Sequence, residues 1–527
     1  MKSYSWILVL IIFIPLYLYF SITSLHNPGL FYDEALQVAP AINYLTDNMN
    51  GNFIYWWHFR EFPVMTMSYI GALKTYIFIP TFYFFGVSPE SIRMTTIMIG
   101  VIVLIFTYLF TSNFFDKKTA LLALLFLATD SSFIFYCRID WGPCAVMLAL
   151  KVIGLFLLTI FYRKRNPIFI IITFFLFGLG IWDKANFMWI VVSLFFALIL
   201  FSKKLNPLVN FRNFEAALLG LILGAYPFIA FNIKFKGATF KNDVFDFLSL
   251  FQNFTLKWAK LIHTFGGISV YKNVFSREPG TILGRSFLPE LILFCLVLFL
   301  AYCLINRKKS DEHFVGKASG LLTFMLLNFF FLLITPEATG SHHSMSLYPI
   351  PHILSAAILI RMFTYLRFEI SAGPVKKSFV PLLIIIPVVF ITFSNLSLIN
   401  AYHQSLKGIG GRGAFSPKLY DLEAYLQNYR NSRIIIPVWG INQNLISLSC
   451  GTLNLREICF LKKDEKENVC LQNMEKYEHL IFVIYSWSSK DERFLYDFAK
   501  KHGYKLTILK SISDAENQEI YKVFKLE

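Results

Sequence analysis

The sequence contains few cysteines and few charged residues for its length, and it lacks the short motifs of several soluble protein classes. Seven cysteines and 16% charged residues are spread over 527 positions. No Cys/His spacing is typical of a zinc finger, no glycine-rich loop is typical of a phosphate cradle, and no internal repeat is present. These absences argue against zinc-finger, phosphate-loop and repeat architectures.

Apolar residues are present in excess instead. Hydrophobic residues make up 56% of the chain, aromatic residues 18%, and the mean hydropathy is +0.55. This balance is foreign to soluble domains and predicts a polytopic, all-α membrane protein. Eleven segments are apolar enough to be spans: Trp6–Ser24, Ile92–Thr111, Ala120–Phe135, Pro143–Tyr162, Ile168–Trp182, Phe187–Phe201, Glu215–Phe231, Phe287–Ile305, Ala318–Thr335, Ile350–Phe363 and Phe379–Ile399. No small-x-small cleavage site follows the first span, so we expect an uncleaved anchor.

Basic residues gather in the short connections at every second span boundary. The connections contain Lys117-Lys118, Arg163-Lys164-Arg165, Lys203-Lys204, Arg307-Lys308-Lys309 and Lys376-Lys377. By the positive-inside rule, this side is cytoplasmic, the N-terminus is cytoplasmic and the C-terminus is extracytoplasmic. Most of the formal charge of +16 therefore reflects topology rather than nucleic-acid binding. We expect an integral protein of the bacterial inner (plasma) membrane.

Three regions are predicted outside the membrane. Loop 25–91 should hold two interfacial helices, one of them over Pro63–Phe85, because Lys74 in the middle of that apolar stretch argues against a span. Loop 232–285 should hold a surface helix at Phe245–Leu261. The sequence thus divides into a transmembrane region, 1–400, and a soluble extracytoplasmic tail, 401–527.

The tail alternates between helical and strand patterns, which predicts a small α/β domain. We expect helices at Leu419–Tyr429 and Asp491–His502, and strands at Arg433–Trp439, Leu480–Tyr485, Lys505–Leu509 and Tyr521–Lys525. The tail also holds Cys450, Cys459 and Cys470. This odd number leaves one cysteine without a partner, and the sequence does not assign the pairing.

Two adjacent acids, Asp33 and Glu34, follow the first span directly. Carboxylates are costly to keep near lipid, so the pair predicts a metal-binding or acid–base site at the membrane face. The alternative is that Asp33 caps a helix, because apolar residues follow at helical spacing. Capping would account for one acid and leave the other unexplained.

Further polar residues lie at the predicted outer ends of other spans. They are Arg60 and Glu61 in the first loop, Arg138 and Asp140 in a tight second loop, Asp183-Lys184, His342-His343, and Tyr348. Each group has a simpler interpretation: Asp183 and Lys184 neutralise each other, Arg138 and Asp140 form an ordinary ion pair, and the histidines belong to a polar loop. Together, however, carboxylates on one face could hold a divalent cation or accept a hydroxyl proton. Neighbouring lysine and arginine side chains could neutralise a phosphate.

The order of these motifs resembles that of the GT-C glycosyltransferases, in particular the family of protein O-mannosyltransferases and the lipid A aminoarabinose transferase. Gly29-Leu-Phe-Tyr-Asp-Glu-Ala35 resembles the family's first-loop motif. Arg60-Glu-Phe-Pro63 resembles its Glu-Lys-Pro-Pro segment without the Lys at the second position. Gly178-Leu-Gly-Ile-Trp-Asp-Lys184 resembles its Gly-Leu-x-x-Leu-Thr-Lys stretch, with Asp in place of Thr. The resemblance covers residues 1–400 and does not extend to the tail.

The resemblance implies an enzyme that moves a sugar from a polyprenyl-phosphate-linked donor to a hydroxyl acceptor (lipid, glycan or protein) on the extracytoplasmic face. Asp33 matches the acid that activates the acceptor or anchors a cation, and Asp140 matches the second acid of that site. The residues assigned to each role are as follows: Asp33, Asp140 and Glu34 catalytic; Lys184, Arg138, Arg60 and Tyr348 substrate-binding; Asp33, Glu61, His342 and His343 ligands of a divalent cation.

A transporter or flippase of a lipid-linked sugar is the alternative from another functional class. Two observations argue against a transporter. The spans hold few charged residues at mid-depth, of which Lys151 is the main one, and no inverted repeat is present. A structural assembly protein is a third alternative, and it leaves the clustered acids unexplained. Loss of turnover with retained lipid binding in an Asp33 variant would separate the transferase from the transporter.

Overall fold

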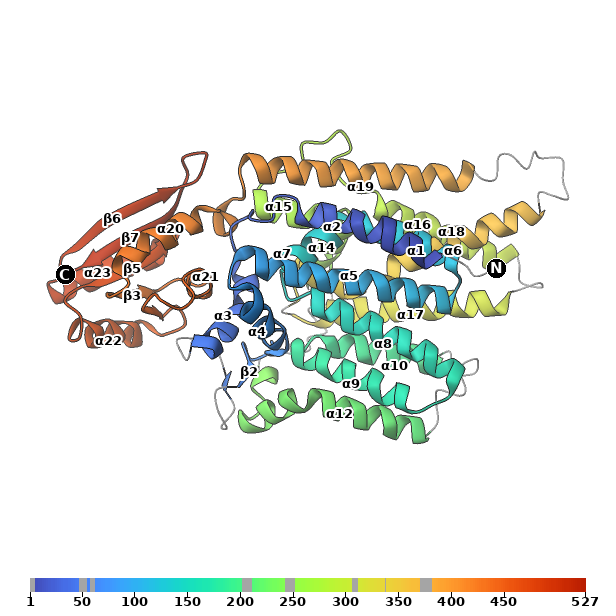
Figure 1. Cartoon of the computed structure of the whole chain (residues 1–527), viewed down its shortest axis with the longest axis horizontal. Helices are drawn as coiled ribbons and strands as arrows, with labels where there is room; N and C mark the ends of the chain where they lie inside the picture. The colour runs from blue at the N-terminus through green and yellow to red at the C-terminus, as the bar shows by residue number, and fades with distance from the viewer. Residues whose placement is uncertain are drawn as a thin grey trace.

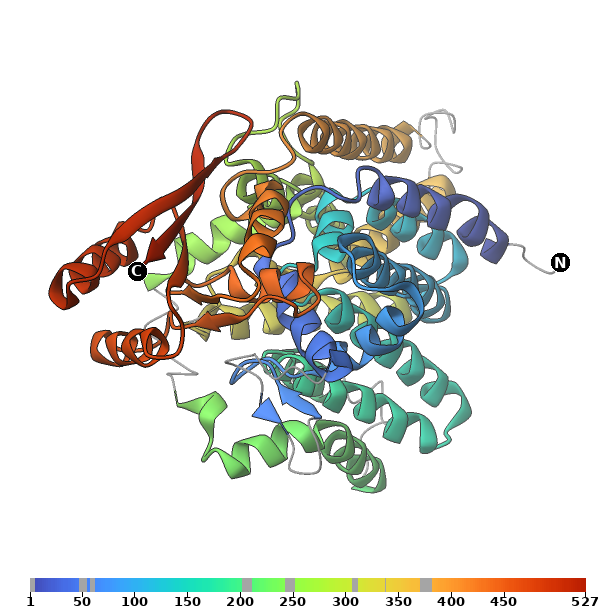
Figure 2. The same ribbon diagram turned by 60° about the vertical axis from the view of Figure 1, so that its left-hand side comes forward.

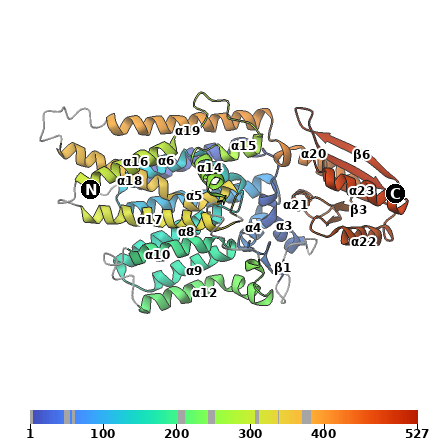
Figure 3. The same ribbon diagram turned by 180° about the vertical axis from the view of Figure 1, so that it is seen from behind.

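A bundle of apolar helices and a smaller tail that contains a β-sheet lie end to end in the computed structural model (Figure 1). The structure describes residues 5–46, 55–56, 62–200, 211–241, 252–305, 311–336, 338–369 and 382–527. Helix α1 (Ser5–Leu8), the first described element, lies toward the end of the bundle away from the tail, and the C-terminus lies at the far end of the tail (Figures 1 and 3).

Each of the eleven predicted spans contains helix. The bundle consists of α1 (Ser5–Leu8), η1 (Val9–Phe13), α2 (Ile14–Ile22), α5 (Pro89–Phe114), α6 (Lys117–Ala128), α7 (Ser131–Ile139), α8 (Ala145–Lys164), α9 (Ile168–Asp183), α10 (Phe187–Leu200), α12 (Phe211–Lys234), α16 (Leu288–Ile305), α17 (Glu312–Ile334), η3 (Ser341–Leu347), α18 (Ile350–Glu369) and α19 (Leu382–Gly408). Among the described residues, six helices are long and apolar enough to cross a membrane, or up to eight if each bent pair is one span. Three shorter apolar helices account for the remaining predicted spans.

Helices at the flanks of the bundle differ from those at its centre. The apolar windows of α5 and α8 are 61% and 67% buried, whereas those of α12 and α16 are each 28% buried and that of α19 is 33% buried. Helices α19 and α12 lie on opposite flanks of the bundle (Figures 1 and 2). Exposed apolar side chains such as Leu219, Leu223 and Phe393 suit a lipid environment, which supplies the apolar contacts that water cannot.

The first loop forms a cap between the bundle and the tail (Figures 1 and 3). It contains α3 (Tyr32–Thr46), β1 (Tyr55–Trp56), β2 (Pro63–Met65) and α4 (Leu73–Phe85). The prediction of one helix over Pro63–Phe85 is wrong in its first part, because β2 pairs antiparallel with β1 and a turn precedes α4. Lys74 lies on α4 and is fully buried.

The second predicted external loop also contains helices. They are η2 (Ala238–Phe240), α14 (Phe254–Phe265) and α15 (Ser269–Phe275). The expected helix over Phe245–Leu261 corresponds to α14 from Phe254 onward, and residues 245–251 lie outside the described part of the chain.

The tail is a small α/β unit, as predicted. Its elements are η6 (Gly413–Phe415), α20 (Lys418–Leu426), η7 (Gln427–Tyr429), β3 (Arg433–Ile436), α21 (Asn442–Leu448), β4 (Leu455–Glu457), α22 (Lys463–Met474), β5 (Leu480–Tyr485), α23 (Ser489–His502), β6 (Leu506–Ser513) and β7 (Glu519–Leu526). The sheet order is β4-β3-β5-β7-β6, with β3 parallel to both β4 and β5 and the other pairs antiparallel. The sequence did not predict α21, β4 or α22. All seven cysteines are free, so Cys450, Cys459 and Cys470 form no disulfide.

Direct contacts fasten the tail to the cap. Phe415 accepts a hydrogen bond from the Gly29 amide at 2.8 Å, and its ring stacks on Phe31 with a centroid distance of 4.1 Å. The Asn444 side chain donates to the Leu30 carbonyl at 2.7 Å. These contacts hold the segment immediately before Asp33 against the tail.

Candidate active site

Asp33 and the second external loop meet although they lie far apart in the sequence. Asp33 is in the first turn of α3, and its Oδ2 accepts a hydrogen bond from the Gly142 amide at 2.8 Å. The residue as a whole is half-buried. Loss of surrounding water raises the pKa of Asp33, while the Gly142 hydrogen bond and the lysines at positions 184 and 74 oppose this shift. A carboxylate in this setting has an increased affinity for a proton.

Asp140 organises the loop that contacts Asp33. Its backbone is left-handed, with φ of 43°, and its Oδ1 accepts hydrogen bonds from the amides of Cys144 and Ala145, both at 2.9 Å. These bonds cap the beginning of α8. Its other oxygen forms a buried ion pair with Lys74, in place of the pair with Arg138 considered from the sequence. Asp140 thereby fixes both the loop and a lysine next to Asp33.

Lys184 follows the end of α9 and reaches the same loop. Its ammonium donates to the Gly142 carbonyl at 2.6 Å, and burial lowers its pKa although Cys144 and the nearby carboxylates oppose this. The buried carboxylate oxygens of Asp183 have no hydrogen-bond partner among the described residues. Asp183 and Lys184 thus form no direct ion pair among the described residues, although each acts on the other electrostatically.

Gly142 is the residue that joins these groups. It binds Asp33 through its amide and Lys184 through its carbonyl, with φ of +70°. A Cβ at this position would lie 2.1 Å from Cδ2 of His342. Both the backbone conformation and the close approach of the imidazole require glycine here.

The two histidines lie beside this centre. The rings of His342 and His343 have a centroid distance of 4.2 Å, and His343 contacts the Asn186 side chain at 3.2 Å. No group of three or more His, Cys, Asp or Glu side chains in the described part of the chain could hold a metal ion. Glu61, one of the predicted ligands, lies outside the described residues, so the divalent cation stays a prediction.

The remaining predicted site residues are placed elsewhere. Glu34 forms a buried ion pair with Arg93, whose two nitrogens reach the two carboxylate oxygens at 2.8 and 2.9 Å. Arg138 donates to the carbonyls of residues 23, 24 and 27 at the end of the first span. Tyr348 donates to Asp130 and to a backbone carbonyl of α14. Arg60 lies outside the described residues.

We expect Glu34→Ala to destabilise the protein by about 3–5 kcal/mol, because the mutation leaves the Arg93 guanidinium buried without its counter-charge. Thermal unfolding of the purified protein measures the effect. Asp421→Ala, which removes an exposed partner of Lys418, is the control and should cost less than about 1 kcal/mol. A Glu34→Gln protein that is fully stable yet inactive would instead support the catalytic role predicted for Glu34 from the sequence.

Three residues of this region were not predicted as functional: Lys74, Arg93 and Gly142. A signal existed for Lys74, since a lysine within an apolar stretch needs a buried counter-charge. The sequence argument used that lysine only to reject a span. Nothing in the sequence alone singles out Gly142 among the 27 glycines.

Comparisons with known proteins identify the fold. Residues 68–231 match the family model described as dolichyl-phosphate-mannose-protein mannosyltransferase. The structure is similar to ArnT from Cupriavidus metallidurans bound to undecaprenyl phosphate, with 10% identity, a TM-score of 0.59, and coverage of 99% of this chain and 98% of that one. The chain has the GT-C glycosyltransferase fold.

A second structure of the same fold is also similar. The archaeal oligosaccharyltransferase AglB from Archaeoglobus fulgidus, in complex with an inhibitory peptide and a dolichol-phosphate, is 13% identical with a TM-score of 0.53, over 91% of this chain and 69% of that one. The search of curated protein sequences finds no match. The predicted resemblance to GT-C glycosyltransferases of the O-mannosyltransferase and ArnT type is confirmed, and no comparison favours the transporter.

Proposed function

We propose that this GT-C protein transfers a sugar from a polyprenyl-phosphate-linked donor to an acceptor hydroxyl at the extracytoplasmic face. The observation that carries the proposal is that a carboxylate, Asp33, and a cation, Lys184, bind the same residue, Gly142. The polyprenyl phosphates bound to the similar ArnT and AglB structures support the choice of donor. The family model that matches residues 68–231 supports the choice of reaction.

The acceptor hydroxyl attacks the anomeric carbon of the donor sugar in this proposal. A bond forms between that carbon and the acceptor oxygen, and the bond from the carbon to the phosphate oxygen breaks. Asp33 takes the hydroxyl proton as general base, and the electron pair of the broken bond leaves with polyprenyl phosphate. The raised pKa of Asp33 makes its carboxylate a stronger base than an ordinary aspartate.

Lys184 stabilises the phosphate that leaves. Its ammonium donates to a neutral carbonyl, and no ion pair engages it within the described ranges. Lys184 is buried, where electrostatic attraction is stronger than in water, and its ammonium would attract an anion against the field of the carboxylates at positions 33, 140 and 183. Lys74 is already paired with Asp140, so it contributes to the local field as part of a neutral pair. The described His, Cys, Asp and Glu side chains form no group of three or more that could hold a metal ion, so no metal ligand is assigned among them.

Incubation of membranes that contain the protein with a polyprenyl-phosphate sugar labelled in the sugar tests this proposal. The label should move into a product other than the donor lipid and free sugar. Membranes without the protein are the control. A donor that stays intact with endogenous acceptors and with added lipid, glycan and protein acceptors would contradict the proposal.

We also propose that the active site and the tail face the extracytoplasmic side of a bacterial inner membrane, with the N-terminus in the cytoplasm. The alternation of basic connections supports this orientation. Cys450 is an exposed thiol in the tail and provides the test. An impermeant maleimide should label it in intact cells, and Cys450→Ser should remove that signal. If Cys450 is labelled only after the membranes are permeabilised, the tail lies in the cytoplasm and the proposed orientation is wrong.

A further inference from the structure

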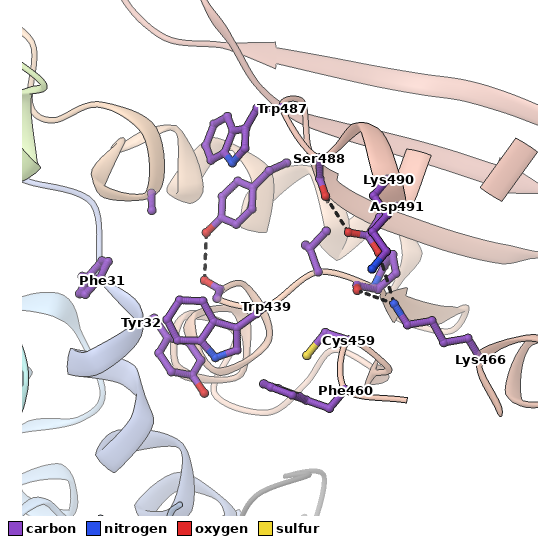
Figure 4. A pocket seen from close by; sticks show the side chains of 15 residues that line it. Phe31, Tyr32, Trp439, Cys459, Phe460, Lys466, Trp487, Ser488, Lys490 and Asp491 are labelled. Carbon is purple, nitrogen blue, oxygen red and sulfur yellow. Dashed lines mark hydrogen bonds and ion pairs between the residues drawn. The ribbon is translucent and has the colours of Figure 1, made fainter. Parts of the chain in front are cut away.

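A cavity of about 430 Å³ opens between the cap and the tail (Figure 4). Its volume lies within the range of about 300–1,000 Å³ that is usual for small-ligand sites. Most of the lining residues of the tail follow the ends of β4, β3 and β5: Cys459-Phe460, Pro437–Gly440, Trp487-Ser488 and Lys490-Asp491. These three strands are parallel neighbours, and the crevice at the carboxyl ends of parallel strands is the usual ligand position in α/β sheets.

Exposed aromatic rings form much of the cavity wall. Trp439, Phe460 and Trp487 are 46%, 57% and 50% exposed, and exposed apolar surface gathered in one place is typical of a binding site. Trp439 packs on Tyr32 of the cap, and Trp487 stacks on Tyr485, with centroid distances of 4.3 and 4.5 Å. Trp439 and Phe460 lie on one side of the cavity and Trp487 lies on the other (Figure 4). The packed rings hold the exposed faces in place.

Polar side chains occupy another part of the wall. The Lys466 ammonium lies 3.3 Å from Asp491, whose second oxygen accepts a hydrogen bond from Ser488 at 2.6 Å (Figure 4). Lys490 lies on the same side. This group offers both donors and acceptors of hydrogen bonds.

The cavity adjoins the candidate active site. Phe31 and Tyr32 line it and directly precede Asp33 in the chain. The Phe31 ring also contacts Trp141, at a centroid distance of 6.2 Å, and Trp141 precedes the Gly142 that binds Asp33. The wall of the cavity is therefore continuous with the segment that carries the proposed general base, although Asp33 itself is not a lining residue.

We propose that this cavity binds the acceptor and that the acceptor is a saccharide. The C–H groups on the face of a sugar ring carry partial positive charge and pack on the negative faces of aromatic rings. The hydroxyl groups on the ring edge need the mixed donors and acceptors that Lys466, Asp491 and Ser488 supply. This inference rests on the proposed function, because it names the substrate that delivers the hydroxyl to Asp33.

A peptide acceptor fits this cavity less well. An extended peptide is commonly held by pairing with a free strand edge. The edge strands of the tail sheet are β4 and β6, whereas β3 and β5, which lead into most of the lining residues, are inner strands. The cavity therefore offers ring faces and side-chain polar groups rather than an unpaired strand.

Calorimetric titration of the purified full-length protein with maltose, cellobiose, chitobiose and mannobiose tests the inference. At least one disaccharide should bind. Trp439→Ala and Trp487→Ala should each weaken that binding about tenfold, which corresponds to about 1.4 kcal/mol. Tyr496→Ala is the control, because Tyr496 is an exposed aromatic residue of the same tail (47%) outside the cavity wall. Asp33→Asn should bind the disaccharide as the unmodified protein does.

The outcomes separate the two proposals. Saccharide binding that the tryptophan variants weaken, in a protein that never consumes donor, would overturn the proposed function and leave the saccharide site standing. Donor consumption without binding of any disaccharide would overturn the saccharide site alone. Binding that is equal in all variants, or binding of a serine- and threonine-containing peptide in place of any sugar, would also overturn it.

Discussion

Asp33→Asn is expected to lower the rate of sugar transfer by about 10²–10⁴-fold, the usual contribution of a general base. The asparagine oxygen can still accept the Gly142 hydrogen bond, so the site should keep its geometry. Donor affinity should change little, because the proposed donor contact belongs to Lys184. Steady-state kinetics with a labelled donor, together with thermal unfolding, measure both effects. Transfer at the normal rate by a folded Asp33→Asn protein would exclude Asp33 as the base.

The pH dependence of transfer provides a second readout of the same group. The base must be deprotonated, and burial raises the pKa of Asp33. Activity should therefore fall as the pH drops through a value above about 4, the ordinary range of aspartate. Residual activity of Asp33→Asn should lack this acidic limb. A limb that persists unchanged in the variant would assign it to another group.

Lys184→Ala is expected to raise the donor KM about 30-fold or more, which corresponds to the loss of about 2 kcal/mol from the interaction of a buried charge with the donor phosphate. Lys184→Arg should restore part of the affinity, because the charge is kept and its geometry changes. Donor titrations in the transfer assay measure the constants. Lys418→Ala, which removes a lysine of the tail surface, is the control and should leave the donor KM unchanged.

An unchanged donor KM in Lys184→Ala would contradict the phosphate assignment. Arg138, the second candidate from the sequence, is held by three backbone carbonyls. Lys74 would then be the nearest remaining cation of the site, and its release from Asp140 would be needed before it could bind a phosphate.

The sequence predicted the helical bundle well because lipid imposes a length and an apolar composition on each span. It also placed the acids of two distant loops at one end of the bundle, since the basic connections orient every span at once. Asp33 and the Asp140 loop do meet there, across 109 positions of sequence between Asp33 and Gly142. Hydrophobic periodicity and charge bias are local signals, so a single sequence is enough to detect them.

Partners of charged side chains were not predictable in the same way. The ion pairs of Lys74 with Asp140 and of Arg93 with Glu34 join residues 66 and 59 positions apart, and only the packed bundle brings them together. The short strand β4 was missed because its three residues carry too little periodicity to distinguish strand from loop. The cavity could not be predicted either, because it forms only where the cap meets the tail.

A donor labelled at both the sugar and the phosphorus atom tests the central claim most directly. If the bond from the anomeric carbon to the phosphate oxygen breaks, the sugar label moves to the acceptor while the phosphorus label stays in polyprenyl phosphate. In proteoliposomes of the unmodified protein, the amount of sugar-labelled product should equal the amount of sugar-free, phosphorus-labelled polyprenyl phosphate. Both amounts should fall nearly to zero with Asp33→Asn. Transfer of both labels together to the acceptor, or movement of the intact donor across the bilayer without chemistry, would contradict the account.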